Sequence, residues 1–236
     1  GLVGSEMCIR DRATTFNNTG SLSFAAGSST TFRSGVVATA PSSIFIGGSI
    51  STWYLGNITL GDSDTPISAS GNAYIFSLVN STMQFGSVTL ADSATFTVGN
   101  GNANSISLSS IAGTLGGASS NITINTSGVV TVAGSIGTDI GTLTITNSGG
   151  ATFSGSVSAA TVTLTNTTGT IAFNGALTAT TLNTAAQAYN VALNAATGTI
   201  TNAVTFSNTG TVTLGTSAGT LAFTGGVVAT APSAVT

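Results

Sequence analysis

Side chains that could carry acid–base or metal chemistry are scarce in this sequence. Its 236 residues include six Asp or Glu, three Lys or Arg, one Cys and no His. Beyond residue 12 the charged residues are Arg33, Asp62, Asp64, Asp92 and Asp139. General acid–base catalysis needs His or a pair of carboxyl groups whose environments separate their pKa values. We therefore expect a protein that is not an enzyme and that holds no cofactor or metal ion.

Asp62 and Asp64, in the segment GDSDTP, are the closest pair of carboxylates. Two carboxylates could contribute to a Ca²⁺ site, which takes about six to eight oxygen ligands. Asp, Ser and Pro are also the residues that form turns. We therefore expect a solvated turn before Pro66 and no metal site.

The adjacent aromatic residues Trp53 and Tyr54 form a candidate binding site, because an exposed aromatic ring can stack against a sugar ring. Neighbouring residues of a strand point to opposite faces of its sheet. We therefore expect one of the two in the core and the other exposed. The isolated residues Tyr74 and Tyr189 face the same choice between core and surface.

A second candidate binding surface consists of threonines spaced two residues apart. Alternate residues of a strand share a face, so such pairs would form a flat array if their strands stack in register. The pairs are Thr142/Thr144, Thr161/Thr163 and Thr211/Thr213. The array resembles the ice-binding surface of some β-solenoid antifreeze proteins. Threonine is also a favoured polar residue of strands in general, and Asn121 and Asn183 interrupt the array.

The elements that must position these residues are short β-strands. Apolar residues alternate with Thr or Ser, as in GTLTITN (141–147), and helix-forming patterns are nearly absent. Apolar residues also recur at a nearly constant interval, at Val132, Phe153, Phe173, Leu193 and Leu214, with a companion series at Ile124, Ile145 and Leu164. The interval is about twenty residues, which is the length of one coil of a parallel β-solenoid. We therefore predict an all-β fold in which these side chains form internal columns.

A longer repeat is superimposed on the coils. The octapeptide GVVATAPS occurs at 35–42 and again at 226–233, and TFNNTGSLSF from Thr15 matches TFSNTGTVTL from Thr205. Phe16 thus corresponds to Phe206 and Pro41 to Pro232, with the offset growing by a single position between them. We expect residues 13–236 to be a single β-solenoid that forms part of a tandem array, with its own repeats continuing at both ends. An alternative fold is a pair of antiparallel β-sandwich domains in each long unit.

Residues 1–12, GLVGSEMCIRDR, differ from the remainder in composition. They hold four of the nine charges and the only Cys, at Cys8. The string VGSEMCIRDR resembles a translated sequencing adaptor that recurs in metagenomic sequences. We therefore expect this segment to be non-native or disordered, and we exclude it from the fold.

The charge-poor blocks NITINTSGVVTVAG, TLTITNSGGATFSG and TVTLTNTTGTIAFNG resemble the passenger repeats of bacterial autotransporters and filamentous-haemagglutinin-like adhesins. The resemblance implies a right-handed parallel β-helix on the outer surface of Gram-negative cells, with coils of about 20 residues here. It implies the stalk and contact region of a secreted or surface-anchored adhesin, with glycans or proteins of a host or a neighbouring cell as partners.

Two other roles stay open. A structural envelope or matrix protein, similar to an S-layer component, would share this composition, and an ice-binding solenoid would use the threonine pairs. The scarcity of Lys and Arg argues against nucleic-acid binding. No run of 18 apolar residues is present, so we expect no membrane insertion within this sequence.

Overall fold

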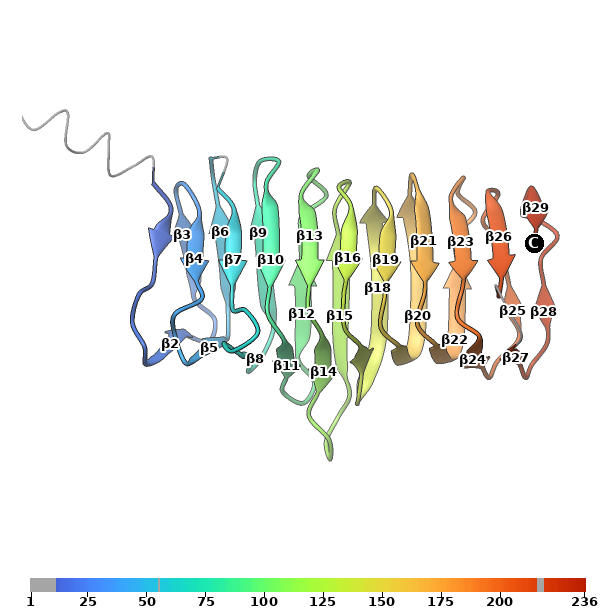
Figure 1. The fold of residues 1–236 in the computed structure, drawn as a ribbon, viewed down its shortest axis with the longest axis horizontal. Coiled ribbons are helices and arrows are strands. Elements are labelled where there is room, and N and C mark those ends of the chain that lie inside the picture. Colours follow the sequence, from blue (N-terminus) through green and yellow to red (C-terminus); the bar gives the residue numbers. More distant parts are fainter. Residues whose placement is uncertain (1–11, 55, 216–218) are drawn as a thin grey trace, which may run out of the picture.

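The structure, a computed structural model, describes residues 12–54, 56–215 and 219–236. It is a rod of stacked coils built from 29 short strands, and the described residues contain no helix (Figure 1). Every strand pair among them is parallel, which excludes the antiparallel sandwich alternative. Of the N-terminal segment expected to be non-native, residues 1–11 lie outside the described residues, and Arg12 is exposed.

The strands form three faces. The first face consists of β1 (Thr14–Thr15), β4 (Val36–Ala38), β7 (Ile58–Leu60), β10 (Thr82–Phe85), β13 (Ser105–Leu108), β16 (Val130–Val132), β19 (Ala151–Phe153), β21 (Thr170–Phe173), β23 (Asn190–Leu193), β26 (Thr211–Leu214) and β29 (Ala234–Val235). The second consists of β2 (Ser21–Phe24), β5 (Ser43–Ile46), β8 (Ile67–Ala69), β11 (Val88–Leu90), β14 (Ile111–Gly113), β17 (Ile136–Gly137), the beginnings of β20 (Val157–Thr167) and β22 (Leu177–Thr184), β24 (Thr197–Ile200) and β27 (Thr220–Phe223). The third consists of β3 (Ser29–Phe32), β6 (Ser49–Thr52), β9 (Ala73–Ser77), β12 (Thr95–Val98), β15 (Ser120–Asn125), β18 (Ile140–Ser148), the ends of β20 and β22, β25 (Val204–Thr205) and β28 (Val227–Val228).

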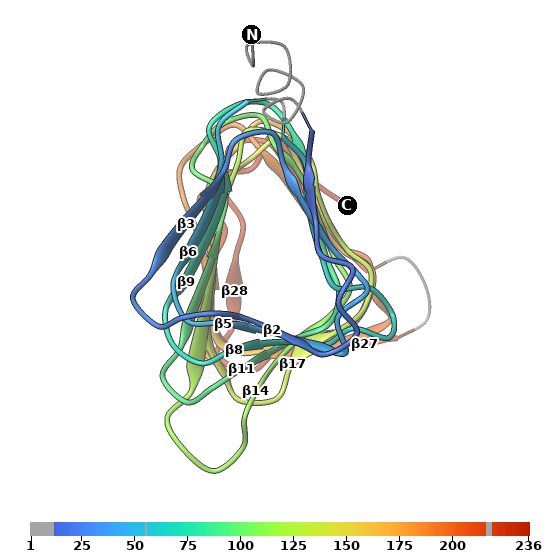
Figure 2. The ribbon, with the colours of Figure 1, turned by 90° about the vertical axis from the view of Figure 1, so that its left-hand side faces the viewer.

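The three faces enclose a triangular cross-section (Figure 2). Viewed from the N-terminal end, the chain passes from the first face to the second and then to the third in a clockwise direction while it recedes from the viewer. The solenoid is therefore right-handed, as the resemblance implied.

Coil length varies along the rod. On the first face the register joins Thr14, Val36, Ile58, Met83, Ile106, Val130, Ala151, Ile171, Val191, Val212 and Val235 in one column. Coils between Val130 and Val212 therefore take 20 or 21 residues, as predicted, whereas the earlier coils take 22 to 25. The average is about 22. Part of the difference is loop length, as in the protruding loop 114–119 between β14 and β15 (Figure 1).

The core consists of the internal columns that the sequence predicts. Val132, Phe153, Phe173, Leu193 and Leu214 pair in sequence along the first face. The rings of Phe153 and Phe173 are fully buried and stack with centroids 4.9 Å apart and planes 8° apart. Ile124, Ile145 and Leu164 form the companion column on the third face. Each coil thus covers the apolar surface of the coil before it, and the core is one continuous cluster.

Small polar side chains are buried where the third face meets the first, because the chain turns there and its backbone groups leave the strand ladders. Thr126 Oγ1 donates to the carbonyls of Asn102 and Asn104 at 2.8 and 2.6 Å. The hydroxyls of Ser148 and Thr167, one coil apart, hydrogen-bond at 2.8 Å. These bonds hold the corner that leads away from the third face.

Candidate functional site

Exposed aromatic side chains gather on the N-terminal half of the third face. We call Trp53, Tyr54, Tyr74 and Phe76 the aromatic patch. Tyr74 and Phe76 alternate with buried residues on β9, so both point outward, and their rings stack at 4.5 Å with planes 27° apart. Register places Phe76 beside Ser51 of β6, two residues before Trp53. The patch therefore spans two neighbouring coils.

Trp53 and Tyr54 do not divide between core and surface as predicted. They are 56% and 58% exposed. The reason is that β6 ends at Thr52, so the strand alternation no longer applies to them. Their backbone amides donate to the carbonyls of Phe32 and Arg33 of the previous coil, at 3.2 and 2.9 Å. The corner is thus anchored while both rings project into solvent.

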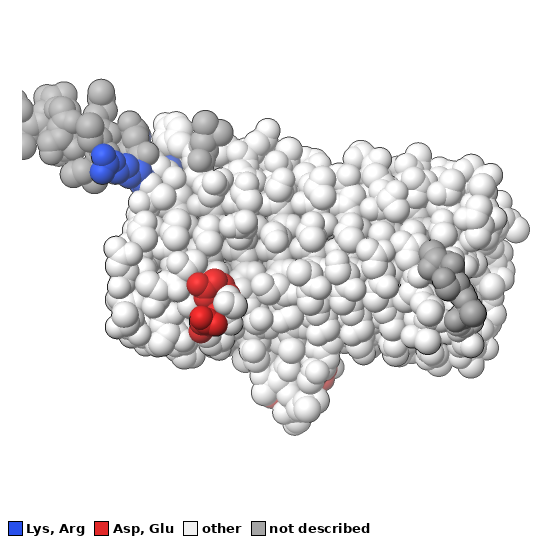
Figure 3. All heavy atoms as spheres, in the orientation of Figure 1, with Lys and Arg blue, Asp and Glu red and all other residues white. Residues whose placement is uncertain are grey.

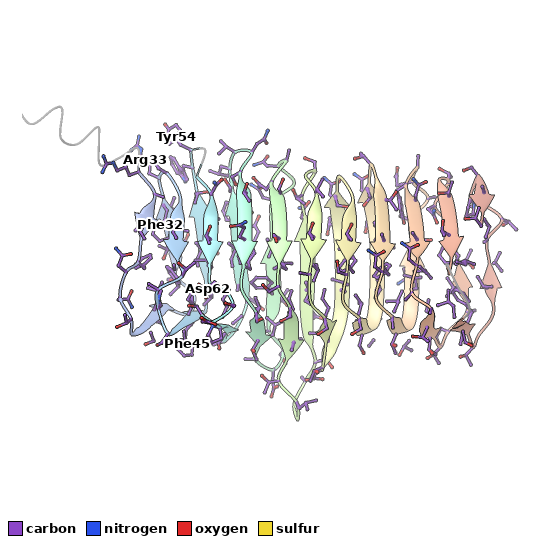
Figure 4. All side chains as sticks on the ribbon, viewed as in Figure 1. Phe32, Arg33, Phe45, Tyr54 and Asp62 are labelled. Atoms are coloured by element: carbon purple, nitrogen blue, oxygen red, sulfur yellow. The ribbon has the colours of Figure 1, made fainter. Side chains whose placement is uncertain are left out.

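Arg33 lies beside the aromatic patch, on the preceding coil. Its guanidinium carbon is 5.5 Å from the centroid of the Tyr54 ring, within the range of a cation–π contact. Thr31, Arg33 and Trp53 line a hollow of about 210 Å³, and the Thr31 hydroxyl hydrogen-bonds to the Ser51 hydroxyl at 2.9 Å. Figure 4 shows Arg33 and Tyr54 together at one corner of the rod. An aromatic ring, a cation and one hydroxyl therefore line the hollow.

The threonine array continues from the same face. Register aligns Tyr74, Thr97, Thr123, Thr144, Thr163 and Asn183 in one outward column. A second column contains Thr95, Asn121, Thr142, Thr161 and Thr181. Neighbours within a column are about 4.8 Å apart, and the two columns are separated by about 6.7 Å. The four predicted residues Thr142, Thr144, Thr161 and Thr163 thus lie on one face, with Asn121 and Asn183 as its interruptions.

Thr211 and Thr213 do not join this array, contrary to the sequence prediction. They lie on β26, which belongs to the first face and pairs with β23. The segment from Thr211 matches the segment from Thr161 in sequence, but the two occupy different faces of the rod.

The carboxylates form no cluster. Asp62 Oδ1 accepts hydrogen bonds from the amides of Asp64 and Thr65, both at 3.0 Å, so Asp62 stabilises a local turn. Within residues 12–54, 56–215 and 219–236, no group of three or more His, Cys, Asp or Glu side chains could hold a metal ion. The face of the molecule drawn in Figure 3 is almost entirely uncharged apart from a small acidic area, further acidic atoms beside the protruding loop, and basic atoms near the N-terminal end.

Tyr189 is a core residue. It is 1% exposed, and its hydroxyl donates to the Leu164 carbonyl and accepts from the Ala185 amide, both at 3.0 Å. Burial raises its pKa to about 12, and the bond from Ala185 lowers it slightly. Burial also raises the pKa of Tyr74, which is nevertheless 36% exposed. Of the two isolated tyrosines, Tyr189 therefore lies in the core and Tyr74 on the surface.

Sequence reasoning missed the association of Phe76 and Arg33 with the aromatic pair. The three coils that bring these residues together have unequal lengths in this half of the chain, so a fixed spacing along the sequence does not align them. The usable signal is the alternation in AYIFS (73–77), which predicts that Tyr74 and Phe76 share an outward face.

Comparisons with protein-family models, with curated proteins and with solved structures found no match to this chain. Among the residues that the structure describes, no helix is long and apolar enough to cross a membrane.

Proposed function

We propose that the protein is a non-enzymatic rod that forms the stalk and contact region of a secreted or surface-anchored bacterial adhesin. The observation that supports this most directly is the uninterrupted first face, on which eleven strands pair in one column from β1 to β29. Ten coil steps at about 4.8 Å give a length on the order of 50 Å. A solenoid of this kind extends in one direction and is stabilised by nearest-neighbour contacts, which suits a spacer.

The aromatic patch is the proposed contact surface. Exposed aromatic clusters mark binding sites more often than isolated exposed residues do. Trp53 and Tyr54 offer ring faces, Arg33 offers a cation, and Thr31 offers a hydroxyl beside the hollow. The hollow is smaller than the 300–1,000 Å³ or so of drug-sized pockets. We therefore expect one ring of a neutral or carboxylate-bearing oligosaccharide from a host or neighbouring cell to bind there.

The test is binding of the full chain to an array of neutral and carboxylate-bearing oligosaccharides. Trp53→Ala should weaken binding at least about tenfold, which corresponds to about 1.4 kcal/mol. Phe45→Ala is the matched control, because Phe45 is 42% exposed but belongs to the second face (Figure 4). Equal binding by wild type and Trp53→Ala, or equal loss in both variants, would contradict the proposed contact surface.

The threonine columns favour a second candidate, an ice-binding rod, because two outward columns stay in register over at least four coils. In that case the chain should inhibit ice recrystallisation, and Thr144→Tyr with Thr163→Tyr should abolish the effect. Thr213→Tyr is the control, since Thr213 lies on the first face. Absence of inhibition by the wild-type chain would eliminate this candidate.

A structural envelope or matrix role is the remaining alternative. It differs from the adhesin proposal in its expected behaviour. Longer arrays of the protein would then assemble with one another into sheets or fibres, and they would bind neither cells nor oligosaccharides. Electron microscopy of the assemblies, together with the binding assay above, separates the two roles.

A further inference from the structure

The two copies of the long repeat fold into the same local structure. β1 pairs with β4 through Thr14/Val36 and Thr15/Val37, and β25 pairs with β28 through the matching residues Val204/Val227 and Thr205/Val228. Likewise β2 pairs with β5 at Leu22/Ile44, and β26 pairs with β29 at Val212/Val235. In both comparisons, the first strand of the later pair is the counterpart of the first strand of the earlier pair at the sequence offset that relates Phe16 to Phe206. The second strand of the later pair is the counterpart at the offset that relates Pro41 to Pro232.

Hydrogen bonds and ring contacts repeat as well. The Phe16 amide donates to the Val37 carbonyl at 2.9 Å, and the Phe206 amide donates to the Val228 carbonyl at 2.9 Å. Phe16 and Phe32 meet edge to face at 6.1 Å, and their counterparts Phe206 and Phe223 do so at 6.3 Å. The repeat is therefore a structural unit as well as a sequence pattern.

The two copies nevertheless occupy different faces. β1 lies on the first face, whereas its counterpart β25 lies on the third; β2 lies on the second, whereas β26 lies on the first. Figure 2 shows β28, the counterpart of β4, on the same side as β3, β6 and β9. From Thr14 the chain makes eight complete coils to Val191, which lies in the same column of the first face. It then passes along the second face and reaches Val204 on the third. The unit is thus one face short of nine coils.

The same segment can fold on any of the three faces because each face requires the same sequence pattern. Every face needs a short strand whose alternate residues are apolar and point inward, followed by a turn. The burial patterns agree: Leu22 and Phe24 on β2, and Val212 and Leu214 on β26, are the inward pair of their strands. A segment is therefore not tied to one side of the triangle.

We infer that, in a tandem array of this unit, each unit places its equivalent surface one face back from that of the unit before it. Successive units are thus rotated about the rod axis by a third of a turn. Equivalent contact surfaces then point in turn to all three sides of the rod and return to the first side after three units. A flat target would meet every third aromatic patch, about 125 Å apart, whereas small soluble glycans could reach all of them. The inference rests on the tandem array that the sequence repeat predicts, and on the proposed role of the rod as a stalk, but it does not depend on what the patch binds.

The experiment is imaging of a three-unit concatemer in a Cys8→Ser background. Residues 46–236 are added twice after Thr236, since Thr236 corresponds to Phe45 in the repeat. Leu115→Cys in each unit carries a gold label, because Leu115 is 76% exposed in the protruding loop. Labels should appear about 42 Å apart along the rod, each rotated by a third of a turn from the last. Labels in a single line along one side would overturn the inference.

A matched control uses whole coils. A concatemer that repeats residues 15–212 contains nine complete coils per unit, because Thr14 and Val212 belong to the same column. Its labels should lie in one line. If its labels also rotate, the rotation comes from supercoiling of the rod and the inference fails.

Cross-linking in the single chain tests the same register without a concatemer. Thr199 and Ala222 are paired residues of β24 and β27 on the second face, so Thr199→Cys with Ala222→Cys should form a disulfide in the Cys8→Ser background. If the second copy were instead in phase with the first, β27 would lie on the third face, as β3 does, and would stack on the end of β22, so that Asn183→Cys with Ala222→Cys would cross-link. Formation of the second bond and not the first would overturn the inference, whatever the saccharide assay shows.

Discussion

Gly155 offers a direct test of how closely the coils stack. It follows Phe153 by two residues and lies over Gly134 of the previous coil, with Gly175 over it in turn. A Cβ atom at Gly155 would overlap the carbonyl group of Gly134 and lie 2.6 Å from the Ser135 amide nitrogen. Real Cβ atoms essentially never approach within 3.0 Å of such atoms. Because the obstacle is backbone, no rotamer change can relieve it.

The cost of Gly155→Ala follows from this geometry. Overpacking costs about 1–3 kcal/mol, and more where the neighbours cannot move. Here the coils on both sides are fixed by strand pairing, so we expect a loss of about 3 kcal/mol. For a protein of this size each kcal/mol lowers Tm by about 2–4 °C, which gives a decrease of about 6–12 °C.

The assay is thermal and urea denaturation followed by far-UV circular dichroism, with Gly71→Ala as the matched control. A Cβ at Gly71 meets no atom within 4 Å. That variant should be neutral, or more stable by about 0.4–1 kcal/mol through the lower entropy of its unfolded chain. If Gly155→Ala proved as stable as Gly71→Ala, the close stacking of the 134, 155 and 175 positions would be refuted.

Two further predictions concern the core. Phe173→Ala should lower the free energy of unfolding by about 3–5 kcal/mol, because Phe173 is fully buried and stacks on Phe153. Phe45→Ala, at an exposed site, should change the free energy of unfolding by less than about 0.5 kcal/mol. Comparable losses in the two variants would contradict the internal column of Phe153 and Phe173. Tyr189 should make stability fall by about 1–2 kcal/mol between pH 10 and 12, because its folded-state pKa is raised from 10.0 to about 12 and the unfolded chain therefore loses its phenol proton first. Unfolding free energies measured across this range should show a smaller decrease for Tyr189→Phe than for wild type, and identical pH profiles would refute the assignment.

Much of the coil structure could be predicted from local sequence patterns. Phe153 and Phe173 lie one coil length apart in the sequence and both occupy inward positions, and the structure pairs them directly. Thr142 and Thr144 alternate with Leu143, so their outward direction follows from the strand period alone. These features succeed because both the alternation and the coil length are regular between Val130 and Val212.

Other features depended on the tertiary structure. Trp53 and Tyr54 are both exposed because β6 stops at Thr52, which alternation does not predict. Phe76, which belongs to the patch, and Arg33, which lies beside it, are brought to Trp53 and Tyr54 by coils of unequal length. Thr211 and Thr213 repeat the pattern of Thr161 and Thr163 yet lie on another face.

The sequence by itself determined which residues point inward within the regular strands, that coils stack, and that a long unit begins again near the C-terminal end of the chain. Only the tertiary structure decided on which side of the triangle each segment lies and which surface residues become neighbours. The physical reason is that alternation is a local property of a strand, fixed by the geometry of two peptide units. The face that a strand occupies depends instead on every corner before it, and the corners differ in length without a periodic signal in their residues.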